Sequence, residues 1–273
     1  MTAINSVTQL HRSDRVAVIS INFPPVNALS AAVRDGIHGA MQAALQDSAV
    51  DAVVLICEGS TFIAGADITE FGKPPAGVSL GEVQRILEES SKPVIAAIHG
   101  TALGGGLEVA LVCHWRIAVP SARLGLPEVN IGLLPGAGGT QRLPRIVGVE
   151  KALEMMTSGS HVGAAEALDI GLIDEMAPEG ELQAEAIALA QRVVAEKRPL
   201  RKVRAQNDKL LAARGQPALF DRFRQANARK FRGLEAPEKI IQCVEAAVNL
   251  PIEEGLKLER QLFIELMQGP QSA

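Results

Sequence analysis

Cysteine is scarce in this chain of 273 residues, and the spaced cysteine and histidine patterns that bind metals are missing. The three cysteines, Cys57, Cys113 and Cys243, are odd in number and lie in apolar segments. We therefore interpret them as buried thiols in a reducing compartment and not as a disulfide framework. The sequence contains no CxxC, HxxxH or HExxH pattern, so we expect no metal site.

Long hydrophobic runs and an excess of positive charge are also lacking. No apolar run reaches the roughly 18 residues that a membrane-spanning helix needs. The formal net charge is −4, which argues against a general nucleic-acid-binding protein. Residues 1–16 show neither the apolar region of a signal peptide nor the acid-free pattern of a transit peptide. These absences favour a cytoplasmic protein with no nucleic-acid or membrane partner.

Apolar residues make up 47% of the chain, which is enough to bury a large core. The alternating stretch 15–23 and the nearly continuous apolar stretches 51–57 and 93–98 predict strands. Between the first two, apolar residues at i, i+4 spacing predict a helix that Asn27 caps and that ends near Asp47. Strands that alternate with helices in this way are typical of an α/β fold.

The later part of the chain is predicted to be richer in helices. Residues 180–197 form an amphipathic helical pattern, and periodic apolar stripes recur at 239–248 and 256–267. We place a domain boundary between these regions. The prediction is a core over 1–198 and a helical C-terminal region over 199–273.

A glycine-rich turn organises the middle of the sequence. Gly104, Gly105 and Gly106 separate the apolar run 93–98 from LEVALVCHW, which has the composition of a buried helix. Glycine tolerates positive φ and lets a ligand approach the backbone closely. A helix that begins there points N–H groups and its positive dipole end at the same space, which suits an anion or a developing oxyanion. Tight strand–helix packing without a ligand explains the glycines about equally well.

Motifs for nucleotide binding and for a serine nucleophile fail at specific positions. A P-loop requires GK[ST], but Leu107 follows Gly106. In a G-x-G-x-x-G fingerprint the third glycine is replaced by Val109, and by Gln141 in the second glycine cluster. No G-x-S-x-G sequence occurs. The glycines therefore indicate neither a nucleotide site nor a hydrolase elbow.

Two glutamates accompany the glycine-rich turn. Glu108 lies in the first turn of the expected helix, among apolar neighbours, and Glu128 lies in a short strand or loop after Pro127. Taken singly, Glu108 is simply an acid favoured by the helix dipole, and Glu128 is an exposed loop acid. Taken together beside a turn suited to an oxyanion, they form a plausible acid/base pair.

Four segments resemble the crotonase, or enoyl-CoA hydratase/isomerase, superfamily. They are FIAGADI at 62–68, KPVIAAIHGTALGGGLEVAL at 92–111, LGLPEVNIGLLPGAGGTQRLPR at 124–145 and GLID at 171–174. The resemblance implies a crotonase-like spiral of β-β-α units followed by a helical C-terminal region. Periodicity alone does not indicate the spiral.

The resemblance also assigns roles to individual residues. The oxyanion hole falls on the backbone N–H groups of Ala66 and Gly105, and the catalytic acids fall on Glu108 and Glu128. The loop that contacts coenzyme A and places the thioester falls on the segment from Ala64 to Asp67. The substrate-binding residues expected from the resemblance are Ala64, Gly65, Asp67 and Gly104.

With both acids present, the resemblance favours hydration of a 2-trans-enoyl-CoA to a 3-hydroxyacyl-CoA in fatty-acid β-oxidation. Glu108 is expected to orient and deprotonate the water, and Glu128 to exchange the proton at C2. No separate cofactor is expected, because coenzyme A is part of the acyl-CoA thioester substrate. A Δ3,Δ2-enoyl-CoA isomerase and a non-catalytic acyl-CoA-binding module remain alternatives.

Two segments depart from the single-function hydratases. VCHWRIA carries His114 where many hydratases have Asp, and residues 246–273 are similar to the hydratase/isomerase half of bifunctional β-oxidation proteins. In those proteins the chain continues into a 3-hydroxyacyl-CoA dehydrogenase. The sequence leaves open a short homologue, a truncated chain or one domain of a longer product. The expected partners are a homo-oligomer or an associated 3-hydroxyacyl-CoA dehydrogenase.

Overall fold

The computed structural model describes residues 2–67, 70 and 72–272. Ile68, the last residue of the FIAGADI segment, lies outside the described residues. The chain forms two compact units, of which the first consists of Met1–Leu124 and Val162–Lys202. The second consists of Gly125–His161 and Val203–Ala273. The domain boundary that the sequence predicts after residue 198 stays a prediction.

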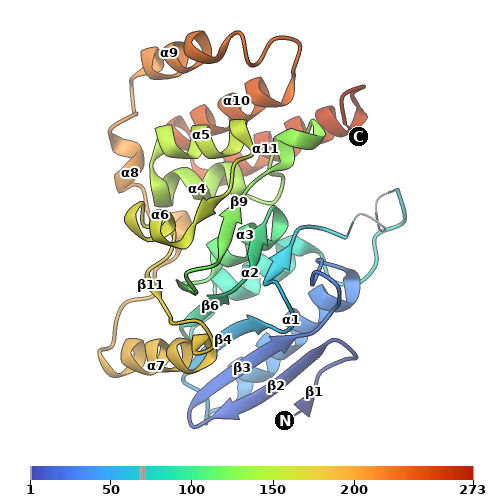
Figure 1. The fold of residues 1–273 in the computed structure, drawn as a ribbon, viewed down its shortest axis with the longest axis vertical. Coiled ribbons are helices and arrows are strands. Elements are labelled where there is room, and N and C mark those ends of the chain that lie inside the picture. Colours follow the sequence, from blue (N-terminus) through green and yellow to red (C-terminus); the bar gives the residue numbers. More distant parts are fainter. Residues whose placement is uncertain (1, 68–69, 71, 273) are drawn as a thin grey trace. The chain divides into compact units, whose positions relative to one another are not determined.

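A sheet of seven strands forms the centre of the first unit (Figure 1). Its middle strands are parallel and read as apolar runs because both faces of a parallel sheet are covered. The predicted strands at 15–23, 51–57 and 93–98 are confirmed. In sheet order the strands are β1 (Thr2–Ala3), β2 (Thr8–Ser13), β3 (Val16–Ile21), β4 (Ala52–Cys57), β6 (Val94–Ile98), β8 (Trp115–Ala118) and β11 (Glu175–Met176).

A second sheet of four short strands alternates with the first along the chain. After each of β4, β6 and β8 the chain adds one strand to this small sheet, and a helix follows the first two of those strands. This alternation is the β-β-α repeat that the resemblance implied, so the predicted fold class is confirmed. The small sheet contains β5 (Ile63–Ala64), β7 (Thr101–Leu103), β9 (Arg123–Gly125) and β10 (Val162–Gly163), and the helices are α2 (Leu80–Glu88) and α3 (Gly105–Val112).

Helix α1 (Ala31–Gln46) begins later than the sequence predicted. Ser30 is its N-cap and accepts a hydrogen bond from the amide of Val33. Asn27 has a φ of 52° and stands in the preceding turn, where its side-chain amide donates to the carbonyl oxygens of Glu58 and Thr61. The prediction that Asn27 caps this helix is therefore wrong. Its side chain is hydrogen-bonded to the carbonyl oxygens of two residues outside the helix and does not accept from a helix amide.

Helix α2 begins in a similar way, with a serine as its own cap. Ser79 accepts a hydrogen bond from the amide of Glu82, and the Glu82 carboxylate accepts one from the amide of Ser79. This reciprocal arrangement is a capping box, which satisfies two donors at the helix start. The first unit also contains α6 (Ala164–Asp169) and α7 (Leu182–Ala195), of which α7 packs against β4 and β6.

The second unit is built almost entirely of helices. Helix α10 packs against α4, α5 and α11, and the apolar stripes predicted at 239–248 and 256–267 lie in α10 and α11. The elements are η2 (Glu128–Ile131), α4 (Gly139–Val147), α5 (Val149–Ser158), η3 (Val203–Ala205), α8 (Asp208–Leu211), α9 (Pro217–Asn227), α10 (Ala236–Asn249) and α11 (Ile252–Gln268).

The three cysteines are buried free thiols, as predicted. Burial raises the pKa of Cys113 and of Cys243 to about 12, which keeps both thiols protonated and unreactive near neutral pH. Within the described part of the chain, none of the helices combines the length and apolar character needed to cross a bilayer.

Candidate functional site

The glycine-rich turn adopts a conformation that only glycines fit. Gly104 has a φ of 52° and a ψ of −127° and occupies the N-cap position of α3, where it offers no side-chain oxygen. A Cβ on Gly106 would stand 2.0 Å from the carbonyl oxygen of Ile63 in β5. The start of α3 is therefore held directly against the small sheet. This packing explains part of the glycine content without a ligand.

The backbone amide of Ala66 lies close to Gly105 in this turn. A Cβ built on Gly105 would lie 3.9 Å from the amide nitrogen of Ala66, so the two residues are neighbours in space. The amide of Gly105 belongs to the first turn of α3, where N–H groups have no partner within the helix. The first bond of this helix runs from the amide of Glu108 to the carbonyl oxygen of Gly104, at 3.0 Å. The structure thus brings together the two residues predicted to form an oxyanion hole.

The peptide unit between Gly65 and Ala66 is oriented by a neighbouring segment. The amide of Leu29 donates to the carbonyl oxygen of Gly65 at 3.0 Å, and Leu29 pairs with Ala66 in an isolated parallel bridge. In a trans peptide the carbonyl and the N–H point in opposite directions. Bonding of the Gly65 carbonyl to Leu29 therefore turns the N–H of Ala66 away from Leu29. The helix predicted to start at Asn27 includes Leu29, so the sequence does not indicate this role.

The remaining substrate-binding candidates surround these amides along the chain. Ala64 ends β5, and its amide donates to the carbonyl oxygen of Val26 at 3.2 Å. Gly65 has a φ of 91°, which turns the chain out of β5 toward Ala66, and Ala66 is exposed. Asp67 is half-buried. Their contacts with a substrate stay predictions.

Glu108 is a buried acid in a helix whose other residues are buried as well. Its residue is 3% exposed, and its carbonyl oxygen accepts a hydrogen bond of 3.5 Å from the side-chain amide of Gln84 in α2. It stands one turn after Gly105 on α3, in the same unit as the two amides. A buried carboxylate close to a turn suited to an oxyanion is placed for acid/base chemistry.

Glu128 lies in the second unit, whereas Glu108 and the two amides lie in the first. It begins the 3-10 helix η2 and not a strand, and its carbonyl oxygen accepts from the amide of Leu133 at 3.0 Å. Its side chain is half-buried. That both glutamates act on one substrate therefore stays a prediction.

His114 belongs to the packing of the first unit. It is fully buried, and its Nδ1 accepts a hydrogen bond of 3.0 Å from the amide of Val94. Burial lowers the pKa of His114 to about 4, so the ring is neutral at physiological pH. These observations give His114 a structural role.

An arginine is buried two residues after this histidine. The guanidinium of Arg116 donates to the carbonyl oxygens of Leu172 and Cys113, both at 2.8 Å. Burial lowers the pKa of Arg116, while the nearby carboxylate of Asp174 opposes this shift. Arg201 forms an ion pair with Asp174 at 2.7 Å and lies over the ring of Trp115. This cluster joins GLID to strand β8 and so has a structural role.

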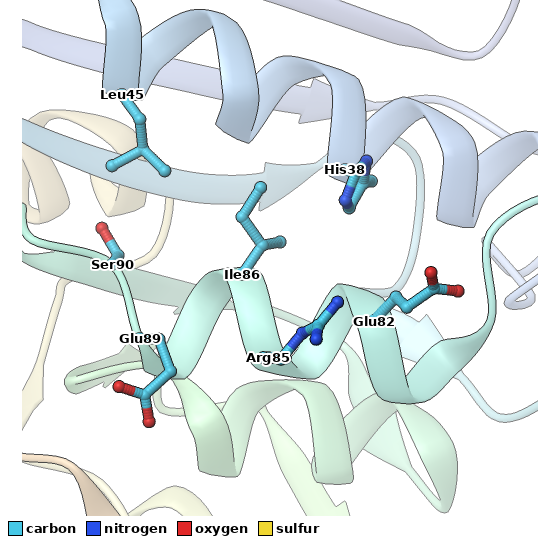
Figure 2. Close-up of a pocket in the computed structure, with 7 residues that line it drawn as sticks. All are labelled: His38, Leu45, Glu82, Arg85, Ile86, Glu89 and Ser90. Atoms are coloured by element: carbon cyan, nitrogen blue, oxygen red, sulfur yellow. The ribbon is translucent and has the colours of Figure 1, made fainter.

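A surface cavity of about 340 Å³ lies between α1 and α2. Figure 2 shows Ile86 of α2 standing between Leu45 and His38 of α1, with charged side chains from α2 around them. None of the predicted site residues lines this cavity. Its lining residues are His38, Leu45, Glu82, Arg85, Ile86, Glu89 and Ser90.

The sequence matches the family model described as enoyl-CoA hydratase/isomerase over residues 11–232. The chain belongs to this family. It is 45% identical over 257 residues to the peroxisomal bifunctional enzyme of Danio rerio, covering 94% of this chain and 35% of that protein. It is 39% identical over 280 residues to the fatty acid oxidation complex subunit alpha of Shewanella loihica, covering 96% of this chain and 39% of that one.

A solved structure supports the same membership. The crystal structure of an enoyl-CoA hydratase from Mycobacterium avium subsp. paratuberculosis is 25% identical, with a TM-score of 0.70 and coverage of 99% of this chain and 97% of that one. The predicted similarity to bifunctional enzymes is confirmed. This enoyl-CoA hydratase/isomerase family member spans little more than a third of the length of the curated relatives cited here.

Proposed function

We propose that the chain is an enoyl-CoA hydratase that converts 2-trans-enoyl-CoA to 3-hydroxyacyl-CoA in fatty-acid β-oxidation. The observation that carries the proposal is the proximity of the Ala66 amide to Gly105, with the buried acid Glu108 one turn along the same helix. Membership of the enoyl-CoA hydratase/isomerase family supports the same reaction.

The chemistry follows from these groups. Hydrogen bonds from the amides of Ala66 and Gly105 to the thioester oxygen draw electrons from the double bond and make C3 electrophilic. They also stabilise the enolate-like charge that develops when water attacks, and one such donor is typically worth about 3–4 kcal/mol. Glu108 orients the water and removes its proton as the oxygen bonds to C3. Glu128 delivers a proton to C2, which completes the addition of one water molecule.

The substrate supplies its own activating group in this proposal. The thioester of coenzyme A provides the oxygen that the amides bind, so no separate cofactor takes part in the reaction. The segment Ala64–Asp67, including Gly65, would contact the coenzyme A portion, and Gly104 would line the thioester because it lacks a side chain. The description of the family, enoyl-CoA hydratase/isomerase, supports a coenzyme A thioester as the class of substrate.

The direct test is hydration of crotonyl-CoA and of longer 2-enoyl-CoAs by the purified chain. The reaction is followed as the loss of absorbance of the conjugated double bond, and the product is identified by mass as substrate plus one water. The expected result is turnover that saturates with substrate. Binding of acyl-CoA without turnover of any enoyl thioester would instead identify a non-catalytic binding module.

A Δ3,Δ2-enoyl-CoA isomerase is a second candidate, because the family's description names both activities. In that reaction one acid moves a proton between C4 and C2, and no water is added. Glu128 would suffice for this transfer. Supplying 3-enoyl and 2-enoyl thioesters side by side separates the two activities, since only isomerisation creates a conjugated double bond.

The partners and the compartment are proposals as well. The match to one part of longer bifunctional enzymes supports association with a 3-hydroxyacyl-CoA dehydrogenase, which would consume the hydroxyacyl product. Self-association as a homo-oligomer is proposed from the family resemblance. The relatives from Danio rerio and Cucumis sativus are named peroxisomal and glyoxysomal. The cytoplasmic location predicted from the sequence stays a prediction, which imaging of the tagged protein would test.

A further inference from the structure

Arg34, in the first turns of α1, forms four side-chain hydrogen bonds. Its guanidinium donates to the carbonyl oxygens of Leu29 at 2.6 Å, Val78 at 2.8 Å and Ala76 at 2.9 Å. It also pairs with the carboxylate of Glu70 at 2.9 Å. The side chain is only 13% exposed. These bonds tie the start of α1 to the segment that precedes it and to the segment that follows the Ala66 loop.

A position near a helix start is unfavourable for a cation. The positive end of the helix dipole repels Arg34, and the first turn of α1 contains no acidic residue to offset this. The hydrogen bonds of Arg34 to carbonyl oxygens and to Glu70 offset this unfavourable interaction with the helix dipole. Arg34 therefore stabilises the loops that it bonds, although its position in the helix is unfavourable for a cation.

The segment that follows Ala66 in the chain also forms hydrogen bonds with the first turns of α1. The second carboxylate oxygen of Glu70 accepts from the amide of Ala31 at 2.6 Å. The carboxylate of Asp35 accepts from the amide of Val78 at 2.7 Å. Glu70 and Val78, which both follow Ala66 in the chain, are thus held by residues in the first turns of α1.

Leu29 contacts Arg34 and also the two loops that carry the amides of Ala66 and Gly105. Its carbonyl oxygen is held by Arg34, and its amide holds the carbonyl oxygen of Gly65. Its side chain is buried, and its Cδ1 lies 3.0 Å from the Cβ position of Gly105. One residue therefore touches both halves of the proposed oxyanion hole, and one guanidinium fixes the main chain of that residue.

We propose that Arg34 is a positioning residue for the carbonyl-binding amides. By holding the carbonyl of Leu29, it fixes the Gly65–Ala66 peptide unit so that the N–H of Ala66 points to the same space as the N–H of Gly105. This inference rests on the proposed function, because it assigns Arg34 to the polarisation of a thioester oxygen. Arg34 does not itself touch the substrate.

The test compares Arg34→Gln with Arg15→Gln. Arg15 is a matched control, because its guanidinium also bonds a carbonyl oxygen, that of Ser48, and a carboxylate, that of Asp51. Two readouts are measured with each variant. The first is the split between kcat and KM for crotonyl-CoA, and the second is the red shift of a conjugated aryl-enoyl-CoA on binding. The red shift reports how strongly the thioester oxygen is hydrogen-bonded, and a loss of folded protein alone would not change it.

In Arg34→Gln we expect kcat to fall between about tenfold and a hundredfold, because misplacing one donor weakens transition-state binding. KM should change less than about threefold, because the remaining contacts with coenzyme A are kept. The red shift per bound ligand should shrink. Arg15→Gln should keep both readouts near those of the parent chain.

Retention of the parental kcat and red shift in Arg34→Gln would overturn the proposal, as would equal losses in both variants. If Arg34→Gln does not fold, Glu70→Gln is the second variant. It keeps an oxygen for the Ala31 amide but replaces the oxygen that accepts from Arg34 with an NH2 group, so the ion pair is lost and a partial loss of kcat and red shift is expected. An unchanged red shift there overturns the proposal. A parent chain that neither binds the probe nor hydrates crotonyl-CoA overturns the proposed function itself.

Discussion

The carboxylate of Glu259 accepts a hydrogen bond of 2.6 Å from the amide of Gly138, a residue 121 positions earlier in the chain. It also accepts from the amide of Thr140 at 3.1 Å and from the Thr140 hydroxyl. Glu259 is 2% exposed. Helix α11 thus supplies the cap for helix α4, whose own N-cap residue is a glycine. A carboxylate in this place satisfies orphan amides and is favoured by the helix dipole.

Replacement of Glu259 by alanine is expected to destabilise the second unit. The variant leaves two buried amides without an acceptor and removes bonds to a charged group, so the free energy of unfolding should fall by about 3 kcal/mol. Urea denaturation followed by circular dichroism measures the change. The control is Glu254→Ala in the same helix, because Glu254 is exposed and pairs only across the surface with Lys257. That control should change stability by less than about 1 kcal/mol. Equal changes in the two variants would show that the cap is unimportant.

Gly106→Ala should disrupt the contact between α3 and β5. The added methyl group would stand 2.0 Å from the carbonyl oxygen of Ile63, so the helix start must move away from the sheet. Overpacking of this kind costs about 1–3 kcal/mol or more, and hydration should be lost together with the stability. Thermal unfolding and the crotonyl-CoA assay measure the two effects.

The matched control for this substitution is Gly81→Ala in α2. The nearest atom to its Cβ position is the Ser79 hydroxyl oxygen at 4.0 Å, so the methyl group has space. Alanine also favours the helix by about 1 kcal/mol over glycine. Gly81→Ala should leave the melting temperature unchanged or raise it. A Gly106→Ala variant that melts like Gly81→Ala would contradict the close approach.

The pKa of His114 predicts an acid-sensitive contribution to stability. The folded chain binds a proton at His114 only near pH 4, whereas the unfolded chain binds it near pH 6.5. Between these values the unfolded state holds more protons, so stability is fully present above about pH 6.5 and falls as the pH drops toward 4. The loss is about 3 kcal/mol over this range. Unfolding by urea at a series of pH values measures the slope.

The control for this slope is His114→Asn, which removes the titrating ring while its side-chain oxygen offers an acceptor for the amide of Val94. The variant should be less stable than the parent chain at neutral pH because a smaller side chain leaves a cavity. Its stability should depend less on pH between 6.5 and 4. An unchanged slope would show that other groups cause the acid sensitivity.

The two glutamates should differ in their effects if their proposed roles are correct. Glu108→Gln keeps the shape of the side chain but cannot accept a proton from water, so hydration should fall by about 10²–10⁴-fold. Glu128→Gln should reduce hydration by a similar factor and also suppress exchange of the C2 hydrogen of a bound acyl-CoA with solvent deuterium. Mass spectrometry measures that exchange. Exposed Glu181→Gln is the control, and it should hydrate like the parent chain.

Burial in the core made much of the first unit predictable from sequence. Strands β3, β4 and β6 are buried along their whole length and, apart from Ser20 in β3, consist of apolar residues, because both faces of the sheet are covered. The pattern of buried apolar residues gave the wrong start for helix α1. Leu29 is buried like Val33 and Ile37 of the helix that follows, so the periodic pattern includes it although it lies outside the helix and pairs with Ala66 in an isolated bridge. Apolar spacing alone does not distinguish these two reasons for burial.

The glycine-rich turn and the two glutamates were predictable from the residues themselves, whereas the partnership of Ala66 with Gly105 was predictable only through the family resemblance. Nothing in the spacing of Ala66 and Gly105 indicates that they meet, because the contact depends on parallel pairing between β5 and β7. Glu128 was expected in a strand or loop and lies in a 3-10 helix, a turn too short to produce a periodic signal. Arg34 gave no sequence signal beyond its charge, since three of its bonds are to main-chain carbonyls that any sequence would present.

The successive β-β-α units of the first sheet begin their helices in different ways. Ser30 and Ser79 close the starts of α1 and α2 with their own side-chain oxygens, whereas Gly104 offers none to α3. The repeated units therefore differ in whether a side-chain oxygen caps the helix. Of these three helix starts, the one without a side-chain acceptor is the one beside Ala66, so its free N–H groups can bind an oxygen from outside the chain without any added side chain.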